Sequence, residues 1–337
     1  PNSLYIHITD VIGRSIGFYK STDGGENWER RSDNIDNITY HWWFSKLFIH
    51  PTEANTIYYC GFHMWKSTNG GITWEQVFSG AHVDHHALVI HPSDPDLVFN
   101  GNDGGLYLSR DGGSNHTEIS NFSNFQFYTC TLDPNNQDVV YGGTQDNGTW
   151  RNTTDLSTNW EFIWGGDGFN VLVEPGNSNV YYVSSQNGSV HRTDNNGSVF
   201  TSVGRSITEN KNWKTPFAID PFEPNIFYFG AESVWKSTNK GDSFTSSSPI
   251  LHNDNSNSER FGTVTTINVS EVNPNFVYAG TDDGNVWLSQ DKGNNWANIN
   301  PPMNMPRWTT SLATNRFEEN VAYVTFSGFR FNSNDGH

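Results

Sequence analysis

The 337-residue chain carries 19 basic and 36 acidic side chains, a formal net charge of −17, and contains 31 Gly but only three Met. This charge argues against binding to nucleic acids or anionic membranes, because both require a basic surface. No apolar run approaches the roughly 18 residues that a membrane-spanning helix needs. The length would ordinarily suggest two domains, but a single repeat domain also fits it.

A short motif recurs along the chain. It consists of Ser, then Asp or Asn two residues later, Gly two residues after that, and Trp or Phe three residues further on. Clear copies begin at Ser21, Ser67, Ser237 and Ser289, a fifth at Ser109 has His116 in place of the aromatic residue, and looser copies cover 151–160 and 192–200. The copies recur at intervals of about 40 to 52 residues, which predicts stacked or radially arranged units.

The chemistry of this box predicts a tight hairpin turn. Asp or Asn at the third position is expected to accept hydrogen bonds from backbone N–H groups one and two residues further on. Gly supplies the positive φ that the turn needs. The aromatic residue is expected to turn inward, so Trp28, Trp74, Phe244 and Trp296 are predicted to be buried.

A second pattern precedes the box in most periods. An apolar strand such as 46–49, 87–90 or 217–219 ends at a turn that contains Pro, and a second strand rich in Tyr and Gly follows. Each period therefore contains four antiparallel strands, which is typical of one blade of a β-propeller. The sequence predicts an all-β propeller of seven to eight four-stranded blades.

Both ends of the chain fall within a repeat, because 1–5 matches 224–228 and the chain stops before an eighth box. We therefore expect 1–337 to be a single propeller cut from a longer secreted multidomain protein. The strands predicted at 4–9 and 309–327 are expected to lie close together, either in a shared closing blade or beside a gap.

Alignment of the repeats on the Pro turn predicts a binding site. Eight residues before the Pro, where each inner strand leaves the central channel, the aligned positions are Trp43, Asp84, Gln126, Asp167 and Trp213; the last two blades add Thr263 and Trp308. Strand alternation places His86 and Tyr128 on the same face. We expect these side chains to form a ring at one mouth of the channel. The alternative is that the Trp residues plug the channel or pack between blades.

His82, Asp84 and His86 form the densest chemical cluster. On a strand they share one face, and such a set can bind zinc or another divalent ion. No fourth ligand is evident, so a polar site in which Asp84 and His86 form hydrogen bonds is favoured. The acidic turns at 102–105, 145–148 and 281–284 suggest calcium, but each also fits a hairpin turn. No cofactor is therefore expected, with calcium left open.

The order of these motifs carries a resemblance to a known group. The segments are 85–88, 102–105, 141–148, 213–216, 228–230, 281–284 and 307–308. Together they resemble the bacterial sortilin-like, glycosyl-hydrolase-type Asp-box (BNR) proteins over about 17–328. The resemblance implies a β-propeller in which the box staples the fold, a secreted or cell-surface location, and further domains in the same precursor.

Two functions remain open. The first is a non-catalytic binding or scaffold module for an extracellular glycan or peptide. The second is a glycoside hydrolase or lyase using Asp84, Asp167 and His86. Xyloglucan-hydrolysing relatives use two Asp from two facing propellers, whereas Asp84 and Asp167 lie on one. Such enzymes need carboxyl groups about 5–5.5 Å or 6.5–9.5 Å apart, a separation that nothing in the sequence sets. A sialidase is disfavoured because no cluster of three Arg is present. The non-catalytic function is favoured.

Overall fold

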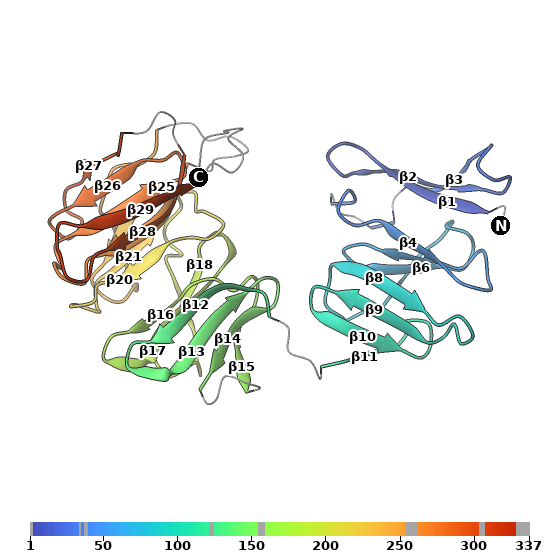
Figure 1. Ribbon diagram of the computed structural model, residues 1–337, viewed down its shortest axis with the longest axis horizontal. Helices are drawn as coiled ribbons and strands as arrows, with labels where there is room; N and C mark the ends of the chain where they lie inside the picture. Colours follow the sequence, from blue (N-terminus) through green and yellow to red (C-terminus); the bar gives the residue numbers. More distant parts are fainter. Residues whose placement is uncertain are drawn as a thin grey trace. The chain divides into compact units, whose positions relative to one another are not determined.

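The computed structural model describes residues 3–33, 35–36, 40–120, 125–153, 159–253, 262–302 and 307–327. Those residues form 29 strands in eight antiparallel sheets, together with one 3-10 helix, η1 (Gln186–Gly188) (Figure 1). The predicted all-β class, with seven to eight propeller blades, is confirmed. None of the helical structure in the described ranges is long and apolar enough to cross a membrane.

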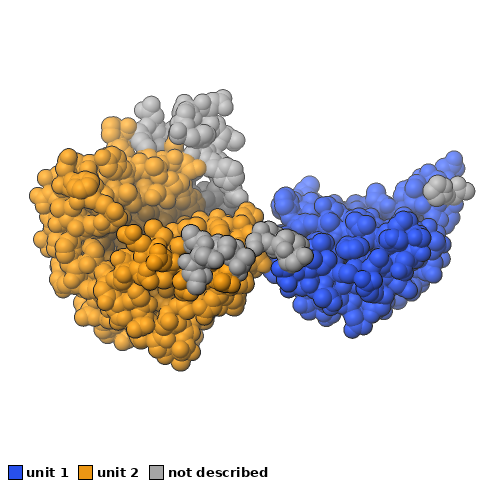
Figure 2. All heavy atoms as spheres, turned by 60° about the horizontal axis from the view of Figure 1, so that its bottom comes forward, with its two compact units in different colours: residues 1–124 blue, residues 125–337 orange. Residues whose placement is uncertain are grey.

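The chain separates into two compact units, 1–124 and 125–337, which Figure 2 distinguishes by colour. Unit 1 contains three sheets in chain order. The first has three strands, β1 (Leu4–Thr9), β2 (Ser15–Ser21) and β3 (Glu29–Ser32). The second comprises β4 (Lys46–Ile49), β5 (Ile57–Cys60), β6 (Met64–Ser67) and β7 (Glu75–Val77). The third comprises β8 (His85–Ile90), β9 (Val98–Asn102), β10 (Gly105–Ser109) and β11 (Thr117–Glu118).

Unit 2 contains the other five sheets. The first comprises β12 (Phe127–Asp133), β13 (Asn136–Thr144), β14 (Gly148–Asn152) and β15 (Trp160–Trp164). The second comprises β16 (Val171–Glu174), β17 (Asn177–Ser185), β18 (Ser189–Thr193) and β19 (Thr201–Val203). The third comprises β20 (Phe217–Ile219), β21 (Phe227–Gly230), β22 (Val234–Ser237) and β23 (Thr245–Ser246). The fourth comprises β24 (Val264–Val269), β25 (Val277–Thr281), β26 (Val286–Ser289) and β27 (Ala297–Asn298). The last pairs β28 (Trp308–Thr314) with β29 (Ala322–Ser327). A single propeller over 1–337, and the proximity of its end strands, stay predictions.

The core of each unit lies between successive sheets. Every residue of the second strand is buried in β5, β21 and β25, because these strands are covered on both faces. One cluster joins Tyr228 and Val234 of one sheet to Val264 and Val277 of the next. Apolar burial of this kind contributes about 25 cal/mol per Å², so the sheets stabilise one another face to face.

The Asp box forms a tight turn, but its hydrogen bonds differ from those predicted. The Ser21 hydroxyl accepts from the Gly25 N–H (2.9 Å) and donates to Asp23 Oδ1 (2.7 Å). The Asp23 carboxylate accepts from the Asn27 N–H, four residues further on, at 3.0 Å. The prediction of bonds one and two residues on was wrong. Positive φ at both Gly24 and Gly25 curls the chain until the N–H of the seventh residue faces the carboxylate.

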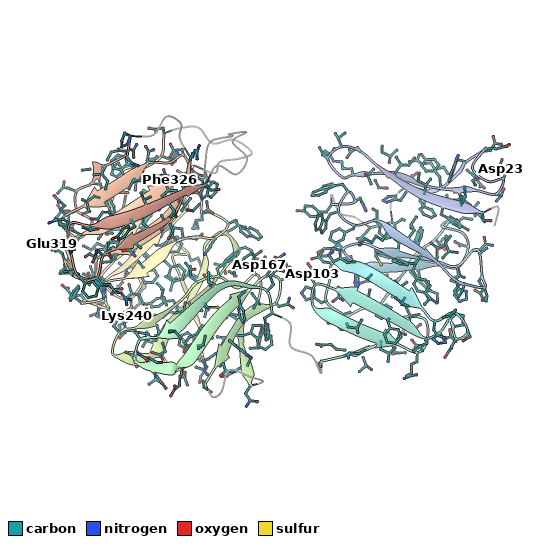
Figure 3. The ribbon with its side chains drawn as sticks, in the orientation of Figure 1. Asp23, Asp103, Asp167, Lys240, Glu319 and Phe326 are labelled. Atoms are coloured by element: carbon teal, nitrogen blue, oxygen red, sulfur yellow. The ribbon has the colours of Figure 1, made fainter. Side chains whose placement is uncertain are left out.

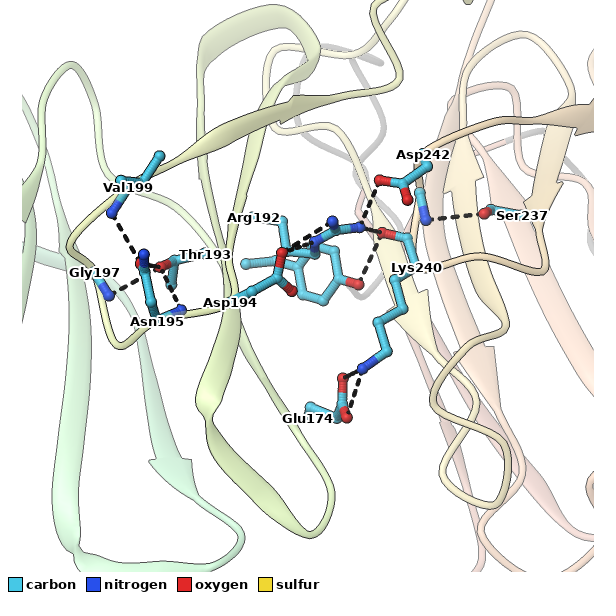
Figure 4. Close-up of polar contacts among 12 residues, drawn as sticks. Glu174, Arg192, Thr193, Asp194, Asn195, Gly197, Val199, Ser237, Lys240 and Asp242 are labelled. Atoms are coloured by element: carbon cyan, nitrogen blue, oxygen red, sulfur yellow. Dashed lines mark hydrogen bonds and ion pairs between the residues drawn. The ribbon is translucent and has the colours of Figure 1, made fainter.

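The fourth residue of the box links one sheet to the preceding one. Its backbone carbonyl accepts a hydrogen bond from a buried Tyr hydroxyl of that sheet. The bonds are Tyr58 to Gly112 (3.1 Å), Tyr182 to Lys240 (3.0 Å) and Tyr228 to Lys292 (3.1 Å). At Lys240, Arg192 Nη1 of the preceding sheet donates to the same carbonyl at 2.6 Å (Figure 4). The box is thus a connection between neighbouring sheets as well as a turn.

The box aromatics are less buried than predicted. Trp74, Phe244 and Trp296 are half-buried, and Trp28 is 43% exposed, so the prediction for Trp28 was wrong. Trp74 packs edge-on against Phe18 of the preceding sheet, with ring centroids 5.1 Å apart. Trp28 belongs to the first sheet of the chain, for which the described residues contain no earlier sheet to pack against.

Candidate functional site

The predicted ring residues do not all begin an inner strand. Trp308 begins β28, and Asp84 and Gln126 directly precede β8 and β12. Trp43, Asp167 and Trp213 instead lie in the loops three or four residues before β4, β16 and β20. The aligned positions therefore share a region, the entry to the inner strand, but not one backbone conformation.

Asp84 departs furthest from the expected geometry. Its φ is 63°, in the left-handed region, so the extended chain begins only at His85. The prediction that His82, Asp84 and His86 share a strand face was therefore wrong, because strand alternation does not extend across Asp84. His82 Nδ1 faces the carbonyl oxygen of Val83 at 2.9 Å. Metal binding by these three residues stays an untested prediction, and the shared strand face on which it was based is absent.

The predicted ring spans both units. Trp43 and Asp84 belong to unit 1, and Gln126, Asp167, Trp213 and Trp308 belong to unit 2. Convergence of the six residues on one face stays a prediction. The same holds for the pairing of Asp84 with Asp167 that a glycoside hydrolase would need. Within each unit, however, predicted residues do come together.

In unit 1 the group forms around His86. The Trp43 ring lies edge-on to the imidazole with centroids 6.3 Å apart, and Phe44 stacks on it at 5.3 Å. His86 Nε2 lies 3.0 Å from Asp103 Oδ1, and Asp103 is at the tip of the β9–β10 hairpin (Figure 3). Trp43 is 61% exposed. An exposed aromatic ring thus stands beside an oriented imidazole–carboxylate pair.

In unit 2 the group forms around Asp167 and Phe169. Both Tyr128 (centroids 5.2 Å apart) and Trp213 (6.1 Å) pack against the Phe169 ring. Phe169 is buried, whereas Tyr128 and Trp213 are 42% and 44% exposed. Burial, and then the nearby carboxylates of Asp167 and Asp146, raise the pKa of Tyr128 above its usual value. Tyr128 therefore lies close enough to Asp167 for the carboxylate to act on its hydroxyl.

Asp167 is a buried and fully oriented carboxylate (Figure 3). Its Oδ1 accepts a hydrogen bond from the Asp146 N–H at 2.9 Å. Its Oδ2 accepts from the side-chain amide of Gln186 in η1. Each oxygen retains a second lone pair. Gln126 is exposed, and its backbone carbonyl accepts from Gln145 at 2.9 Å, which ties the β13–β14 hairpin to the entry of β12.

The acidic turn at 281–284 acts as a structural hairpin. Asp282 and Asp283 are buried. Asp282 Oδ1 accepts from the Thr263 N–H at 3.2 Å, and Asp283 Oδ2 accepts from the Asn253 N–H at 2.8 Å. These carboxylates are satisfied by the protein's own N–H groups, which supports the turn interpretation at this position.

Three residues of these groups were not predicted, namely Phe44, Asp103 and Gln186. Asp103 was considered as part of a hairpin turn or a calcium site, and Gln186 lies in the corresponding hairpin of a later sheet. A hydrogen bond recurs from such a hairpin to the entry of an inner strand. It brings hairpin residues beside the predicted site, and the alignment on the Pro turn did not include it. Examples are Asp103 N to Asp84 O (3.3 Å) and Asn187 N to Trp213 O (3.0 Å).

The fold and the box define the class: an Asp-box repeat protein built from β-propeller blades. Residues 17–157 match the family model described as Sortilin-Vps10 (sortilin, neurotensin receptor 3). This match confirms the sortilin-like resemblance predicted from the motifs. No curated protein matches the chain.

Solved structures of low similarity include two glycoside hydrolases. The GH74 enzyme of Niastella koreensis is 17% identical with a TM-score of 0.32, and the match covers 97% of this chain and 61% of that one. The GH74 xyloglucanase of Xanthomonas campestris is 15% identical with a TM-score of 0.31, covering 94% and 61%. YCF48 from Cyanidioschyzon merolae is 12% identical with a TM-score of 0.43, covering 83% and 92%. The chain thus spans less than two thirds of the GH74 enzymes, and we draw no function from these matches.

Proposed function

We propose that the protein is a secreted or cell-surface scaffold that binds a glycan or a peptide without chemical conversion. The observation that carries this proposal is the group in unit 2, in which two half-exposed aromatic rings pack on Phe169, two residues from the oriented carboxylate of Asp167. Trp213 and Tyr128 are held by the buried Phe169, and Asp167 is held by Gln186 and the Asp146 N–H. Such a site is rigid before any ligand arrives, which lowers the entropy cost of binding.

The composition of the site favours a neutral glycan. Sugar rings stack their C–H faces on aromatic side chains, and their hydroxyls donate to carboxylate oxygens. The protein's net charge of −17 disfavours a polyanionic ligand. A basic peptide would also complement Asp167, and it is the other ligand class that the experiment must include.

The experiment is an array of neutral, uronic and sulfated glycans and of basic and acidic peptides, probed with the purified chain. Any hit is followed by calorimetry and by a reducing-sugar assay. Trp213→Ala should weaken the hit by about tenfold or more, corresponding to ~1.4 kcal/mol. The matched control is Phe222→Ala, an aromatic residue that is 51% exposed beside the Pro turn of the same sheet.

Two outcomes would contradict the proposal. Equal loss of affinity in the Trp213 and Phe222 variants would mean that the ligand does not bind at this group. Release of reducing sugar by the wild-type chain, abolished by Asp167→Asn, would instead support the glycoside hydrolase.

A further inference from the structure

A chain of hydrogen bonds runs through unit 1 beneath the turn 40–45. It contains two histidines, His7 of β1 and His41 of the turn, whose rings lie edge-on with centroids 4.9 Å apart. The hydrogen bonds connect them through Tyr59 of β5, which is fully buried. The six bonds are Asp36 O to His41 Nε2 (3.1 Å), His41 Nδ1 to Tyr59 OH (2.5 Å), Tyr59 OH to Ser45 Oγ (3.1 Å), Ser45 Oγ to His7 Nδ1 (3.0 Å), His7 Nε2 to Ser15 Oγ (2.8 Å) and Ser15 Oγ to Asp33 O (2.8 Å).

Both ends of this chain are backbone carbonyls, so the number of N–H and O–H donors decides how many of its bonds can form. The carbonyl oxygen of Asp36 can only accept, so His41 Nε2 carries a hydrogen. In neutral His41 the other nitrogen, Nδ1, then accepts from Tyr59. Between Tyr59 and Ser45 either hydroxyl can donate, and the donor to Ser45 or Ser15 depends on the tautomer of His7. With both histidines neutral, the two rings and the three hydroxyls supply one donor each, which is one donor fewer than the six bonds.

One added proton can be accommodated and a second cannot. With both rings neutral, one of the six bonds has no hydrogen to share. A proton on either histidine supplies a donor for each of the six bonds. When both rings are charged, one hydroxyl proton of Tyr59 or Ser45 has no acceptor within the chain. The two cations then also stand side by side in a largely buried site, where charge repulsion is strong.

The surroundings offer limited compensation for such charge. Among the described residues of this cluster the acidic ones are Asp36 and Asp33. The Asp36 carboxylate already accepts from the His63 N–H (2.8 Å) and faces His63 Nδ1 (3.2 Å). The Asp33 carboxylate pairs with Arg30 at 3.1 Å. Burial lowers the pKa of His41 against the opposing effect of the Asp36 carbonyl and carboxylate. Burial, and then His41, lower the pKa of His7 from 6.5 to about 4.

The turn depends on this cluster for its position. Ser45 has a φ of 70°, a conformation that is unfavourable for a residue other than Gly. Its hydroxyl is bonded to both His7 and Tyr59, and its N–H to the Cys60 carbonyl at 3.0 Å. The turn presents Trp42 and Trp43, which are 62% and 61% exposed, to solvent. Loss of the Ser45 and His41 side-chain bonds would remove this support from the turn.

We propose that the His7–His41 pair holds the turn 40–45 in place at neutral pH and releases it in acid. The turn is held while the pair carries at most one proton and is released when both rings are charged. This inference concerns unit 1 alone and stands whether or not the protein binds a glycan.

The direction of the effect follows from linkage. The histidines bind protons less readily when the turn is closed than at their ordinary pKa of 6.5 when it is released. Closure is therefore favoured above pH 6.5 and weakens as the pH falls toward 4. When His7 takes the second proton of the pair, a change in its pKa from 6.5 to about 4 makes opening on the order of 100-fold more favourable between pH 7 and pH 4.

The experiment is hydrogen–deuterium exchange of the whole chain at pH 7 to 4, corrected for the chemical exchange rate. The reporters are the N–H groups of Trp43 and Ser45, which bond to the carbonyls of Tyr40 and Cys60. Their exchange should accelerate by at least about tenfold over this range. In His7→Gln, which keeps polar groups but cannot titrate, the acceleration should disappear. His91→Gln, in the Pro turn after β8, should behave like the wild type.

Imidazole NMR of the wild-type chain provides a test that needs no variant. The second ring of the pair to gain a proton should do so in the same pH range as the turn opens. Three results would overturn the proposal: protection that is equal at pH 7 and pH 4, the same acceleration in His7→Gln, or both rings charged while the turn stays protected.

Discussion

The connection between the β20–β23 and β24–β27 sheets offers the sharpest test of how the box holds the fold. The Lys292 carbonyl, at the fourth position of its box, accepts from the Tyr228 hydroxyl at 3.1 Å and from Lys236 Nζ at 2.7 Å. Tyr228 is fully buried, and Lys236 is half-buried over its ring, 5.9 Å from the centroid. Either donor alone satisfies the carbonyl, so the two substitutions should not act independently.

Tyr228→Phe removes one hydroxyl and leaves the packing of the ring unchanged. It should cost about 0.5–1.5 kcal/mol, the usual net value of one hydrogen bond. Lys236→Met keeps the aliphatic stem and should cost about 1 kcal/mol or less. The double variant leaves the carbonyl between the sheets without either donor. It should therefore lose about 1 kcal/mol more than the sum of the single losses.

The assay is equilibrium unfolding in urea, followed by Trp fluorescence and circular dichroism, whose transitions must coincide for the free energies to be compared. Tyr323→Phe is the matched control, because Tyr323 is 61% exposed on β29; its effect should lie within about 0.5 kcal/mol. If the losses of Tyr228→Phe and Lys236→Met add to within ~0.3 kcal/mol in the double variant, the shared carbonyl is not a joint link between sheets.

Two further predictions concern the box itself. Gly71 has a φ of +87°, and an added Cβ would lie 2.1 Å from the buried Phe18 ring, so Gly71→Ala should cost about 2–4 kcal/mol in urea unfolding. Gly176→Ala, at a φ of +83° with nothing within 4 Å, should cost only about 1–2 kcal/mol, and equal losses would contradict the packing argument. Hydrogen bonds from the Asn three or four positions on and from the box Ser lower the pKa of Asp23, Asp111 and Asp291 to about 2. Because these values lie below the ordinary 3.8, the stability they contribute is complete above about pH 4 and is lost as the pH falls toward 2. Asp291→Asn should reduce that slope in urea midpoints measured from pH 5 to 2, and an unchanged slope would contradict the assignment.

The box was predictable because its chemistry is local. Ser, Asp and Gly within five residues specify a turn wherever they occur, and alternating apolar residues specify the strands on either side. The acceptor pattern was missed because it depends on φ at the fourth position. Gly24, Gly70 and Gly112 make that conformation visible in the sequence, but Lys240 and Lys292 adopt it as well, with φ values of 58° and 57°.

The candidate site was less predictable because its loops vary in conformation. An alignment on the Pro turn counts residues, but Ser45 and Asp84 take positive φ without being Gly. One residue with positive φ interrupts the alternation of a strand, so the side chains before and after it no longer share the face that counting predicts. The hydrogen-bonded histidines were missed for another reason. His7 and Ser45 are 38 residues apart, and the alignment of the repeats gives no sign that they meet.

The two ends of each sheet carry different constraints, and this explains where a binding site can develop. At one end the box is fastened to the Pro turn of its own sheet, through bonds such as Gly112 N to Asp96 O and Lys240 N to Asn225 O, both 2.9 Å. The backbone carbonyl of the fourth box residue accepts a hydrogen bond from a Tyr of the preceding sheet. Substitution there disturbs the packing of neighbouring sheets.

At the other end, the hairpin between the second and third strands meets the entry of an inner strand through a backbone bond that recurs in several sheets, with side-chain contacts that differ from sheet to sheet. Asp103 N to Asp84 O, Gln145 N to Gln126 O and Asp282 N to Thr263 O are all bonds of this kind. A backbone bond holds the geometry whatever side chain is attached. The entry positions can therefore carry Asp, Gln, Thr or Trp without loss of the fold. The repeat is uniform where the sheets are joined, and it can vary in chemistry where a ligand would bind.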